Sequence, residues 1–295
     1  MSGDAPSDIF DRRLLRRRRD RAAPDYADFD FLVNEMTERV VERLADVRRS
    51  FGTTLVLGCH AGQVAAGLPQ AQVGEVIQAD LSPAMVAQVG GTRLVLDEER
   101  LPFGFDRFDL VIAVGNLHWV NDLPGALIQI RYALKPDGLL LAAMPGGRTL
   151  HELRACLAEA DVQVNADRVG PFIDVPDAGD LLRRTGYALP VADIDTLTVS
   201  YAHPLKLLQD LRGMAESNVL AENARASLGR RTLLEVCRLY QKNHADEKGR
   251  VRATFQLLML AAWSPGPGQP KPLRRGSGQT SLADILGRDG PEALS

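Results

Sequence analysis

The 295-residue sequence predicts an α/β fold with a mostly parallel sheet covered by helices on both faces, and three observations support this prediction. Short apolar or β-branched segments alternate with helical segments along residues 50–145. The strand-like segments are apolar throughout, as in parallel strands buried on both faces. Glycine and polar residues follow several of these strands, at the edge where parallel sheets bind ligands.

The elements are expected in a regular order along the chain. In the first long helix, Leu32, Met36, Val40 and Leu44 recur at four-residue spacing and form one apolar face. Helices are expected at residues 30–49, 62–68, 82–89, 123–134, 149–160 and 177–185, followed by a long helical section at 203–245. Strands are expected at residues 53–57, 75–79, 93–96, 108–114, 139–144, 191–201 and 252–263. The helical section between the last two strands suggests a cap at the sheet edge.

We divide the chain into three regions. Residues 1–49 are a basic N-terminal helical segment, in which seven arginines lie between Arg12 and Arg21. Residues 50–263 are the main domain, with a helical insertion at about 203–248. Residues 264–295 are a tail rich in proline and glycine, which we expect to be irregular.

The composition argues against several classes of protein. The net charge is −3 and no aromatic residues interleave with the arginines, so nucleic-acid binding is not expected. Cys59, Cys156 and Cys237 have no metal-ligand spacing, which predicts no metal site and a reducing compartment. No apolar segment reaches transmembrane length. Aspartates within the arginine-rich segment argue against a transit peptide, so we expect a cytoplasmic location in a bacterium.

Glycine or acidic residues follow three successive expected strands. Gly58, Cys59 and Gly62 lie in a turn before a helix, where backbone amides can approach a ligand. Asp80 follows the next strand and can accept hydrogen bonds from ribose hydroxyls, and Asp97 follows the third strand. Taken singly, these residues are equally well explained as a tight turn, a helix-capping acid and a solvated loop acid. As a set at one sheet edge, they predict a ligand site.

Together these motifs resemble those of the class I S-adenosylmethionine (SAM)-dependent methyltransferases. The resemblance is carried by residues 58–62, 80–85, 97–103, 108–111 and 134–138. It implies a Rossmann-like three-layer sandwich with a mostly parallel seven-stranded sheet, a helical cap insertion and SAM as cofactor. A nicotinamide-binding Rossmann protein is the weaker alternative, because the three-glycine fingerprint is absent.

The resemblance also implies which residues contact the cofactor. Gly58, Cys59 and Gly62 correspond to the loop beside the methionine part. Asp80, with Leu81 next to it, corresponds to the ribose contact. Asp97 and Glu98 correspond to the adenine side, and Asn116 is a further candidate contact.

Two residues depart from the family pattern. Val56 stands where the family usually has an acidic residue, and His60 stands where it usually has glycine. SAM carries a sulfonium and an ammonium group, so the loss of a nearby acid should weaken its binding. A histidine side chain also crowds a position where close backbone approach matters.

Asn116, His118 and Trp119 follow the fourth expected strand, beside the place where the methyl group of SAM would lie. They are the candidates for ordering the substrate, and His118 is a candidate base near neutral pH. The alternative is a structural role, because histidine and tryptophan are often largely buried. The catalytic residue is therefore not assigned.

Segments outside these motifs resemble a narrower group. Residues 10–23, 211–218 and 253–256 are similar to malonyl-carrier-protein methyltransferases of biotin synthesis and to a mitochondrial complex I assembly factor. Residues 118–124, 144–150 and 271–282 are more similar to the assembly factor. That factor's assigned reaction is hydroxylation of an arginine in an iron–sulfur subunit of complex I. The resemblance implies a complex I subunit as partner, docked by the arginine-rich helix and the insertion, at the inner face of a membrane.

Four functions follow from these resemblances. The first is SAM-dependent methylation of a protein in complex I assembly, and the second is arginine hydroxylation of a complex I subunit. The third is an assembly chaperone that kept the fold and lost the chemistry. The fourth is carboxyl methylation on an acyl carrier protein.

Overall fold

The structure is a computed structural model that describes residues 8–160, 168–223 and 228–269. Most of the proline- and glycine-rich tail lies outside the described residues. This includes residues 271–282, which resemble the assembly factor. No helix among the described residues is long and apolar enough to cross a membrane.

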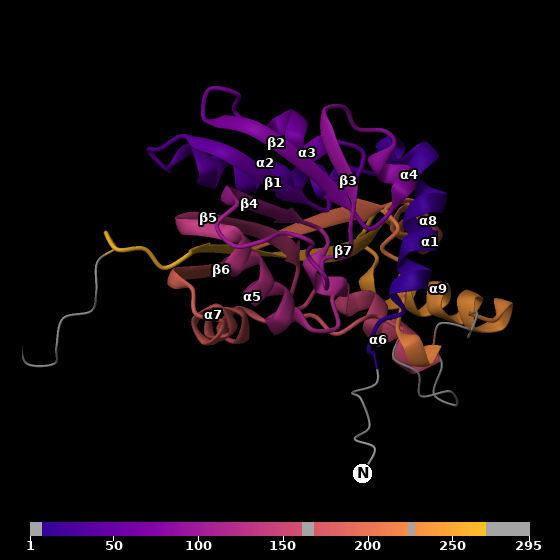
Figure 1. The fold of residues 1–295 in the computed structure, drawn as a ribbon. Helices are drawn as coiled ribbons and strands as arrows, with labels where there is room; N and C mark the ends of the chain where they lie inside the picture. The colour runs from indigo at the N-terminus through magenta and orange to yellow at the C-terminus, as the bar shows by residue number, and fades with distance from the viewer. Residues whose placement is uncertain (1–7, 161–167, 224–227, 270–295) are drawn as a thin grey trace, which may run out of the picture.

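Seven strands of the described chain form one sheet, in the order β3-β2-β1-β4-β5-β7-β6 (Figure 1). The strands β1 to β5 are parallel, and β7 is antiparallel to both of its neighbours. The bounds of the strands are β1 Phe51–Leu57, β2 Val73–Asp80, β3 Thr92–Val95, β4 Phe108–Val114, β5 Leu134–Pro145, β6 Ala188–Tyr201 and β7 Val251–Trp263. The expected mostly parallel seven-stranded sheet is confirmed.

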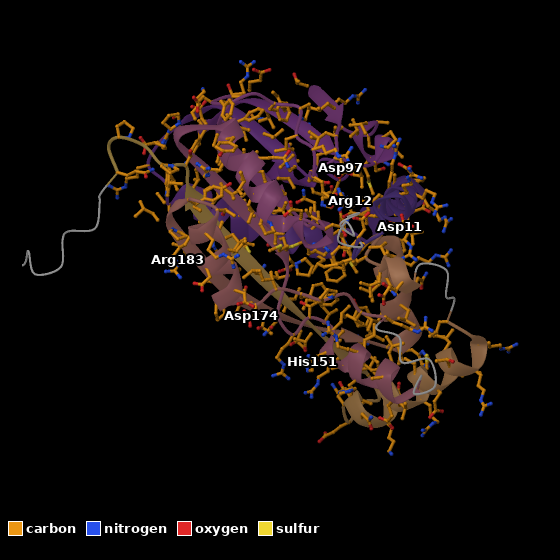
Figure 2. The ribbon with its side chains drawn as sticks, turned by 60° about the horizontal axis from the view of Figure 1, so that its bottom comes forward. Asp11, Arg12, Asp97, His151, Asp174 and Arg183 are labelled. Atoms are coloured by element: carbon orange, nitrogen blue, oxygen red, sulfur yellow. The ribbon has the colours of Figure 1, made fainter. Side chains whose placement is uncertain are left out.

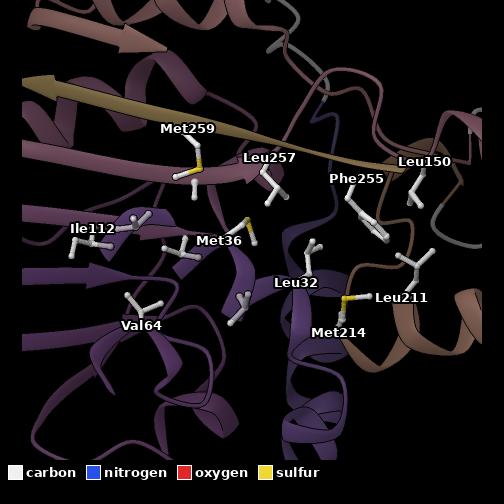
Figure 3. Packing of buried hydrophobic residues seen from close by; sticks show 14 of the residues in the cluster. Leu32, Met36, Val64, Ile112, Leu150, Leu211, Met214, Phe255, Leu257 and Met259 are labelled. Carbon is white, nitrogen blue, oxygen red and sulfur yellow. The ribbon is translucent and has the colours of Figure 1, made fainter. Parts of the chain in front are cut away.

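Helices cover both faces of the sheet. One face packs against α2 (Phe31–Ala45) and α3 (Gln63–Gly67), and the other against α5 (Leu123–Ala133) and α7 (Val175–Arg184). The apolar face predicted for the first long helix is buried, since Leu32, Met36, Val40 and Leu44 are all part of the core. Figure 3 shows Leu32 and Met36 packed in it. This core continues between α6 (His151–Ala160), α8 (Pro204–Gly213) and α9 (Arg230–His244).

In its described residues, the section expected to be helical over 203–245 contains the two α-helices α8 and α9. The first, α8, ends at Gly213, and Ala215 adopts a left-handed φ of 62°, which turns the chain away from the helix axis. A short 3-10 helix, η3 (Ala221–Asn223), precedes α9. The turn carries Glu216 toward residues that follow β4, as described below.

The arginine-rich segment forms helix α1 (Arg12–Ala22), followed by the 3-10 helix η1 (Ala23–Asp28). Asp11 caps α1 by accepting a hydrogen bond from Leu14 N at 2.8 Å. An isolated β-bridge joins Phe10 to Leu220, and Asp11 N donates to Val219 O at 2.8 Å. The side chain of Asp20 accepts from Ser82 Oγ at 2.6 Å, at the start of α4 (Pro83–Val86). Helix α1 is therefore held across the ends of the strands rather than extending into solvent (Figure 1).

Candidate functional site

The carboxyl ends of β1, β2 and β4 bring together several of the residues singled out from the sequence. Cys59 N donates to Ala79 O at 3.0 Å, next to Asp80. Gly58 has φ 70°, and a Cβ there would lie 2.7 Å from Val114 O and 2.9 Å from Asn116 Cβ. Glycine is therefore required at Gly58 by both conformation and space.

Asp80 is completely buried and holds a buried arginine from α1. Arg19 Nη1 lies 3.2 Å and 3.3 Å from the two carboxylate oxygens of Asp80, and Arg19 Nη2 donates to Gly115 O at 3.0 Å. The same carboxylate accepts from the backbone amides of Ser82 at 2.8 Å and His60 at 3.3 Å. Both oxygens of the expected ribose contact are thus already hydrogen-bonded.

A second arginine of α1 occupies the carboxylates that follow β3. Arg12 Nη2 donates to Asp97 Oδ1 at 2.8 Å and to Glu98 Oε2, and Arg12 Nη1 lies 3.3 Å from Trp119 O. Figure 2 shows Arg12 and Asp97 side by side at the N-terminal end of α1. The other oxygen of Glu98 accepts from Asn116 Nδ2 at 3.2 Å. The four carboxyl or amide side chains predicted at these strand ends therefore form one network with two guanidinium groups.

The charges in this network hold the arginines in their charged form. Burial alone would lower the pKa of Arg19, but the charges of Asp80 and Glu98 reverse this effect and raise it. Burial likewise would lower the pKa of Arg12, but the charges of Glu98 and Asp97 outweigh this effect and raise it. A buried charge of this kind persists only where it is paired, so α1 and the strand ends depend on each other.

His60 fills space at the turn after β1. Its backbone has a left-handed φ of 47°, a conformation that glycine adopts at less cost. Its Nε2 lies 2.8 Å from Val114 O, and its Nδ1 lies 3.1 Å from the Tyr26 hydroxyl. Because a carbonyl only accepts, Nε2 carries the proton and Nδ1 accepts from Tyr26. Burial, and then the charge of Arg19, lowers the pKa of His60, so this histidine is neutral.

Glu216 binds the two aromatic candidates that follow β4. Its Oε2 accepts from His118 Nε2 at 2.9 Å and from Trp119 Nε1 at 3.1 Å. Burial would raise the pKa of Glu216, but His118, Arg19 and His60 together outweigh that effect and the pKa is lowered. His118 and Trp119 are thus held by a carboxylate. Asn116 has a different place, in the network of Glu98.

A cavity of about 440 Å³ adjoins this histidine–carboxylate pair. Apolar groups supply most of its wall, and the aromatic rings of Trp119, Phe172 and Phe255 contribute to it. Glu216 provides an acidic group, and Arg18 and Arg168 provide basic ones. A cavity of this size and composition suits a side chain or small molecule with a long apolar part and one polar end.

Gly62 lies directly before a helix, as expected, whereas the surroundings of Leu81 and Cys59 were not specified by the sequence. Leu81 packs in an apolar cluster with Phe10, Leu15 and Trp119 rather than beside the acidic network. Gly62 is the N-cap of α3 with φ 101°. Cys59 is buried, and burial raises the pKa of its thiol. Contacts of these residues with a cofactor remain predictions.

The structure adds Arg12, Arg19, Tyr26 and Glu216 to the residues singled out from the sequence. One signal was available for the arginines, because Arg12, Leu15 and Arg19 follow a three- and four-residue spacing that places them on one helix face. Glu216 had no comparable signal. Within the described ranges, no three His, Cys, Asp or Glu side chains are grouped so as to hold a metal ion.

The residues do not fit SAM in this arrangement. The ribose contact expected of Asp80 is taken by Arg19 and two backbone amides, and the adenine-side carboxylates are taken by Arg12. His60 occupies the position of a family glycine, and Val56 is fully buried where the family has an acid. Against this, Asn116 Oδ1 is buried without a hydrogen-bond partner in the described chain. Because Arg12 and Arg19 occupy the expected contacts, SAM could bind there only if α1 moved away from the strand ends.

The sheet order and the polar groups at its strand ends define a protein of the class I methyltransferase fold. Residues 55–142 match the family described as "Methyltransferase domain". The chain is 38% identical to "Arginine-hydroxylase NDUFAF5, mitochondrial" of Danio rerio, over 94% of this chain and 89% of that protein. It is 34% identical to the malonyl-acyl-carrier-protein O-methyltransferase of Halorhodospira halophila, over 91% and 92% respectively. The chain belongs to the family of methyltransferase-fold proteins that contains both groups.

Solved structures agree with this assignment of the fold. The YcgJ protein of Bacillus subtilis has a TM-score of 0.55 and 14% identity, covering 77% of this chain and 98% of that chain. Phosphoethanolamine N-methyltransferase 2 of Haemonchus contortus, solved with SAM, has a TM-score of 0.52 and 18% identity, covering 85% and 60%. Similarity at this level of identity concerns the fold, and it confirms the Rossmann-like methyltransferase fold expected from the motifs.

The Arg19–Asp80 pair generates a prediction about stability. Arg19→Met leaves Asp80 buried without its charged partner, so the free energy of unfolding in urea should fall by about 3–5 kcal/mol. Arg19→Met/Asp80→Asn removes both charges and should recover most of this loss. Arg16→Met, at an exposed position of the same helix, should change the free energy by less than about 0.5 kcal/mol. Similar losses at positions 16 and 19 would contradict the pairing.

The buried neutral His60 generates a prediction about pH. Its folded-state pKa is lower than the unfolded value, so its contribution to stability is complete above about pH 6.5 and is lost as the pH falls. Between about pH 7 and pH 5, wild-type stability should fall by up to about 1.4 kcal/mol per pH unit from this group. His60→Gly should show a shallower dependence in urea unfolding, whereas Arg16→Met keeps the wild-type slope. An unchanged slope in His60→Gly would refute this role.

Proposed function

We propose that this chain is an enzyme that modifies an arginine of a protein during the assembly of respiratory complex I. The support from sequence is its identity of 38–39% to proteins named arginine-hydroxylase NDUFAF5, over 94% of the chain. The complex I subunit as substrate comes from the assembly-factor resemblance. We place this activity in the bacterial cytoplasm, at the inner face of the membrane.

One structural observation carries the proposal: the site binds guanidinium groups. Arg12 and Arg19 of α1 lie against Asp80, Asp97 and Glu98 at the strand ends. A planar guanidinium with several donors matches such carboxylates better than an ammonium group does. The same edge of the fold therefore supplies the chemistry that an arginine substrate needs for recognition.

The neighbouring cavity is the place we assign to the substrate side chain. Its apolar wall, with Leu150 and Phe255, suits the aliphatic part of an arginine. Glu216 suits the guanidinium, and Trp119 offers a ring for stacking. In this proposal, Glu216 binds the substrate and also orients His118, so the residues of this chain bind and position the arginine.

Methyl transfer with SAM is the second candidate, and the motif positions favour it. Gly58, Asp80 and Asn116 lie together at the strand ends, as the methyltransferase resemblance implies. The malonyl-acyl-carrier-protein O-methyltransferases among the relatives also favour it, and they keep carboxyl methylation of a carrier protein as the narrower alternative. For either reaction, Asp80, Asp97 and Glu98 would first have to exchange the arginines of α1 for the cofactor.

A deletion strain tests the arginine-modification proposal. Mass spectrometry of the complex I iron–sulfur subunit should show the loss of one oxygen atom's mass on an arginine, and a plasmid carrying the wild-type gene should restore it. Asp97→Asn, within the site, should restore less of the modification than Asp180→Asn on the exposed surface of α7. An unmodified subunit in the wild type, or full modification in the deletion strain, would exclude hydroxylation by this chain. If Asp97→Asn fully restores complex I assembly in the deletion strain without restoring the modification, the chaperone alternative is supported.

Calorimetric titration with SAM tests the second candidate. Because the arginines of α1 occupy the site, the apparent affinity of the wild type should be reduced by the small fraction of open molecules. Arg12→Ala should therefore bind SAM more tightly than the wild type, by about tenfold if opening limits binding. Arg16→Ala is the matched control on the exposed face of α1. If neither variant binds SAM at about millimolar concentration, near the weak limit of specific binding, methyl transfer is excluded.

A further inference from the structure

A second pocket, of about 480 Å³, lies between α1, η1 and α8. Three arginines line it: Arg18 and Arg21 from α1, and Arg212 from the last turn of α8. Asp25 is the acidic residue in its wall. The pocket is therefore basic, in contrast to the acidic network that the same helix covers at the strand ends.

The three arginines have little to neutralise them. Within the described part of the chain, neither Arg21 nor Arg212 forms an ion pair, and Arg18 donates to the backbone oxygen of Asn218. Burial lowers the pKa of Arg18, and the charges of Arg21, Arg17 and Arg212 lower it further. Like charges placed this close favour the binding of an anion, because the anion removes their repulsion.

The geometry of the pocket is fixed by packing. Gly213, next to Arg212, lies against the ring of Phe29, and a Cβ at this glycine would meet the ring at 2.2 Å. Lys206 lies over the same ring at 5.4 Å. Arg18 and Arg21 are three residues apart on α1 and so share one face of it. The three cations are thus presented by α1 and α8, and the Phe29–Gly213 contact joins the end of α8 to the residue that follows η1.

The basic pocket adjoins the cavity assigned to the substrate. Arg18 and Ser217 line both spaces, and Glu216 of the cavity precedes Ser217 in the chain. A ligand that extended from the cavity would therefore reach the basic pocket within a short distance.

We propose that this basic pocket binds a carboxylate side chain of the protein partner, close to the residue that enters the cavity. The inference rests on the proposed function in one respect, namely that the substrate is a protein. A nucleic acid fits less well, because the one aromatic ring in the wall, Phe29, is packed against Gly213 and gives bases no stacking surface. The pocket thus selects substrates that carry an acidic residue near the modified position.

Binding of a fluorescein-labelled hexaglutamate peptide, followed by anisotropy at low ionic strength, tests this pocket on the full chain. Arg212→Gln should weaken binding about two- to fivefold, the range expected for loss of one exposed ion pair. Asp25→Asn removes the opposing acid and should strengthen binding by a similar factor. Arg184→Gln, the same change of charge on α7, should leave the affinity unchanged; Figure 2 shows neighbouring Arg183 well away from Arg12.

Several outcomes would overturn the proposal. They are equal weakening by Arg212→Gln and Arg184→Gln, no effect of Arg212→Gln, or weaker binding by Asp25→Asn. Tighter binding of an oligothymidylate with the same number of charges would assign the pocket to nucleic acid instead. The assay requires no catalysis, so the peptide result stands even if the deletion strain retains its modified arginine. Conversely, loss of that modification with no effect of Arg212→Gln would leave the proposed function intact and reject only the pocket.

Discussion

The buried ion pair between Arg19 and Asp80 is the interaction on which the arrangement of this site depends. It joins α1 to the end of β2, and the same guanidinium reaches Gly115 O after β4. Around it, Arg12 binds the carboxylates after β3, and Asp20 binds the start of α4. Each of these contacts places a polar group of α1 at the edge where α/β folds bind ligands. The protein therefore pairs the carboxylates at its strand ends with its own arginines when α1 is in place.

The two departures from the family pattern have a physical explanation in this arrangement. Where the family has an acid, Val56 is buried among apolar residues, where an unpaired negative charge would be costly. His60 replaces a glycine at the cost of a left-handed backbone, and it gains hydrogen bonds to Val114 O and the Tyr26 hydroxyl. Its ring also stacks on Tyr26, with an interplanar angle of 6°. His60 thereby joins the turn after β1 to the N-terminal segment through Tyr26.

The fold could be predicted from the sequence because it depends on local patterns. The apolar run of β4 has the bounds expected for it, Phe108–Val114, and the acid after β2 lies at the strand end as expected. The position of α1 across the strand ends could not be predicted from such local patterns. Seven arginines within ten residues give little indication of which ones are buried, and only contacts with distant carboxylates select Arg12 and Arg19. The position of Glu216 could not be predicted either, because it depends on the left-handed turn at Ala215 after α8.

The β-bridge between Phe10 and Leu220 has a mechanical consequence. It fastens the start of α1 to the segment that follows Glu216, through Asp11 N to Val219 O and Ala221 N to Ile9 O. A displacement of α1 that keeps this bridge must carry the 216–221 segment with it. The acidic strand ends and the cavity wall at Glu216 would then be uncovered in a single cooperative movement, whose rate is set by the release of the buried ion pairs. Ligand exchange at the strand ends and at the cavity would then share one rate-limiting step.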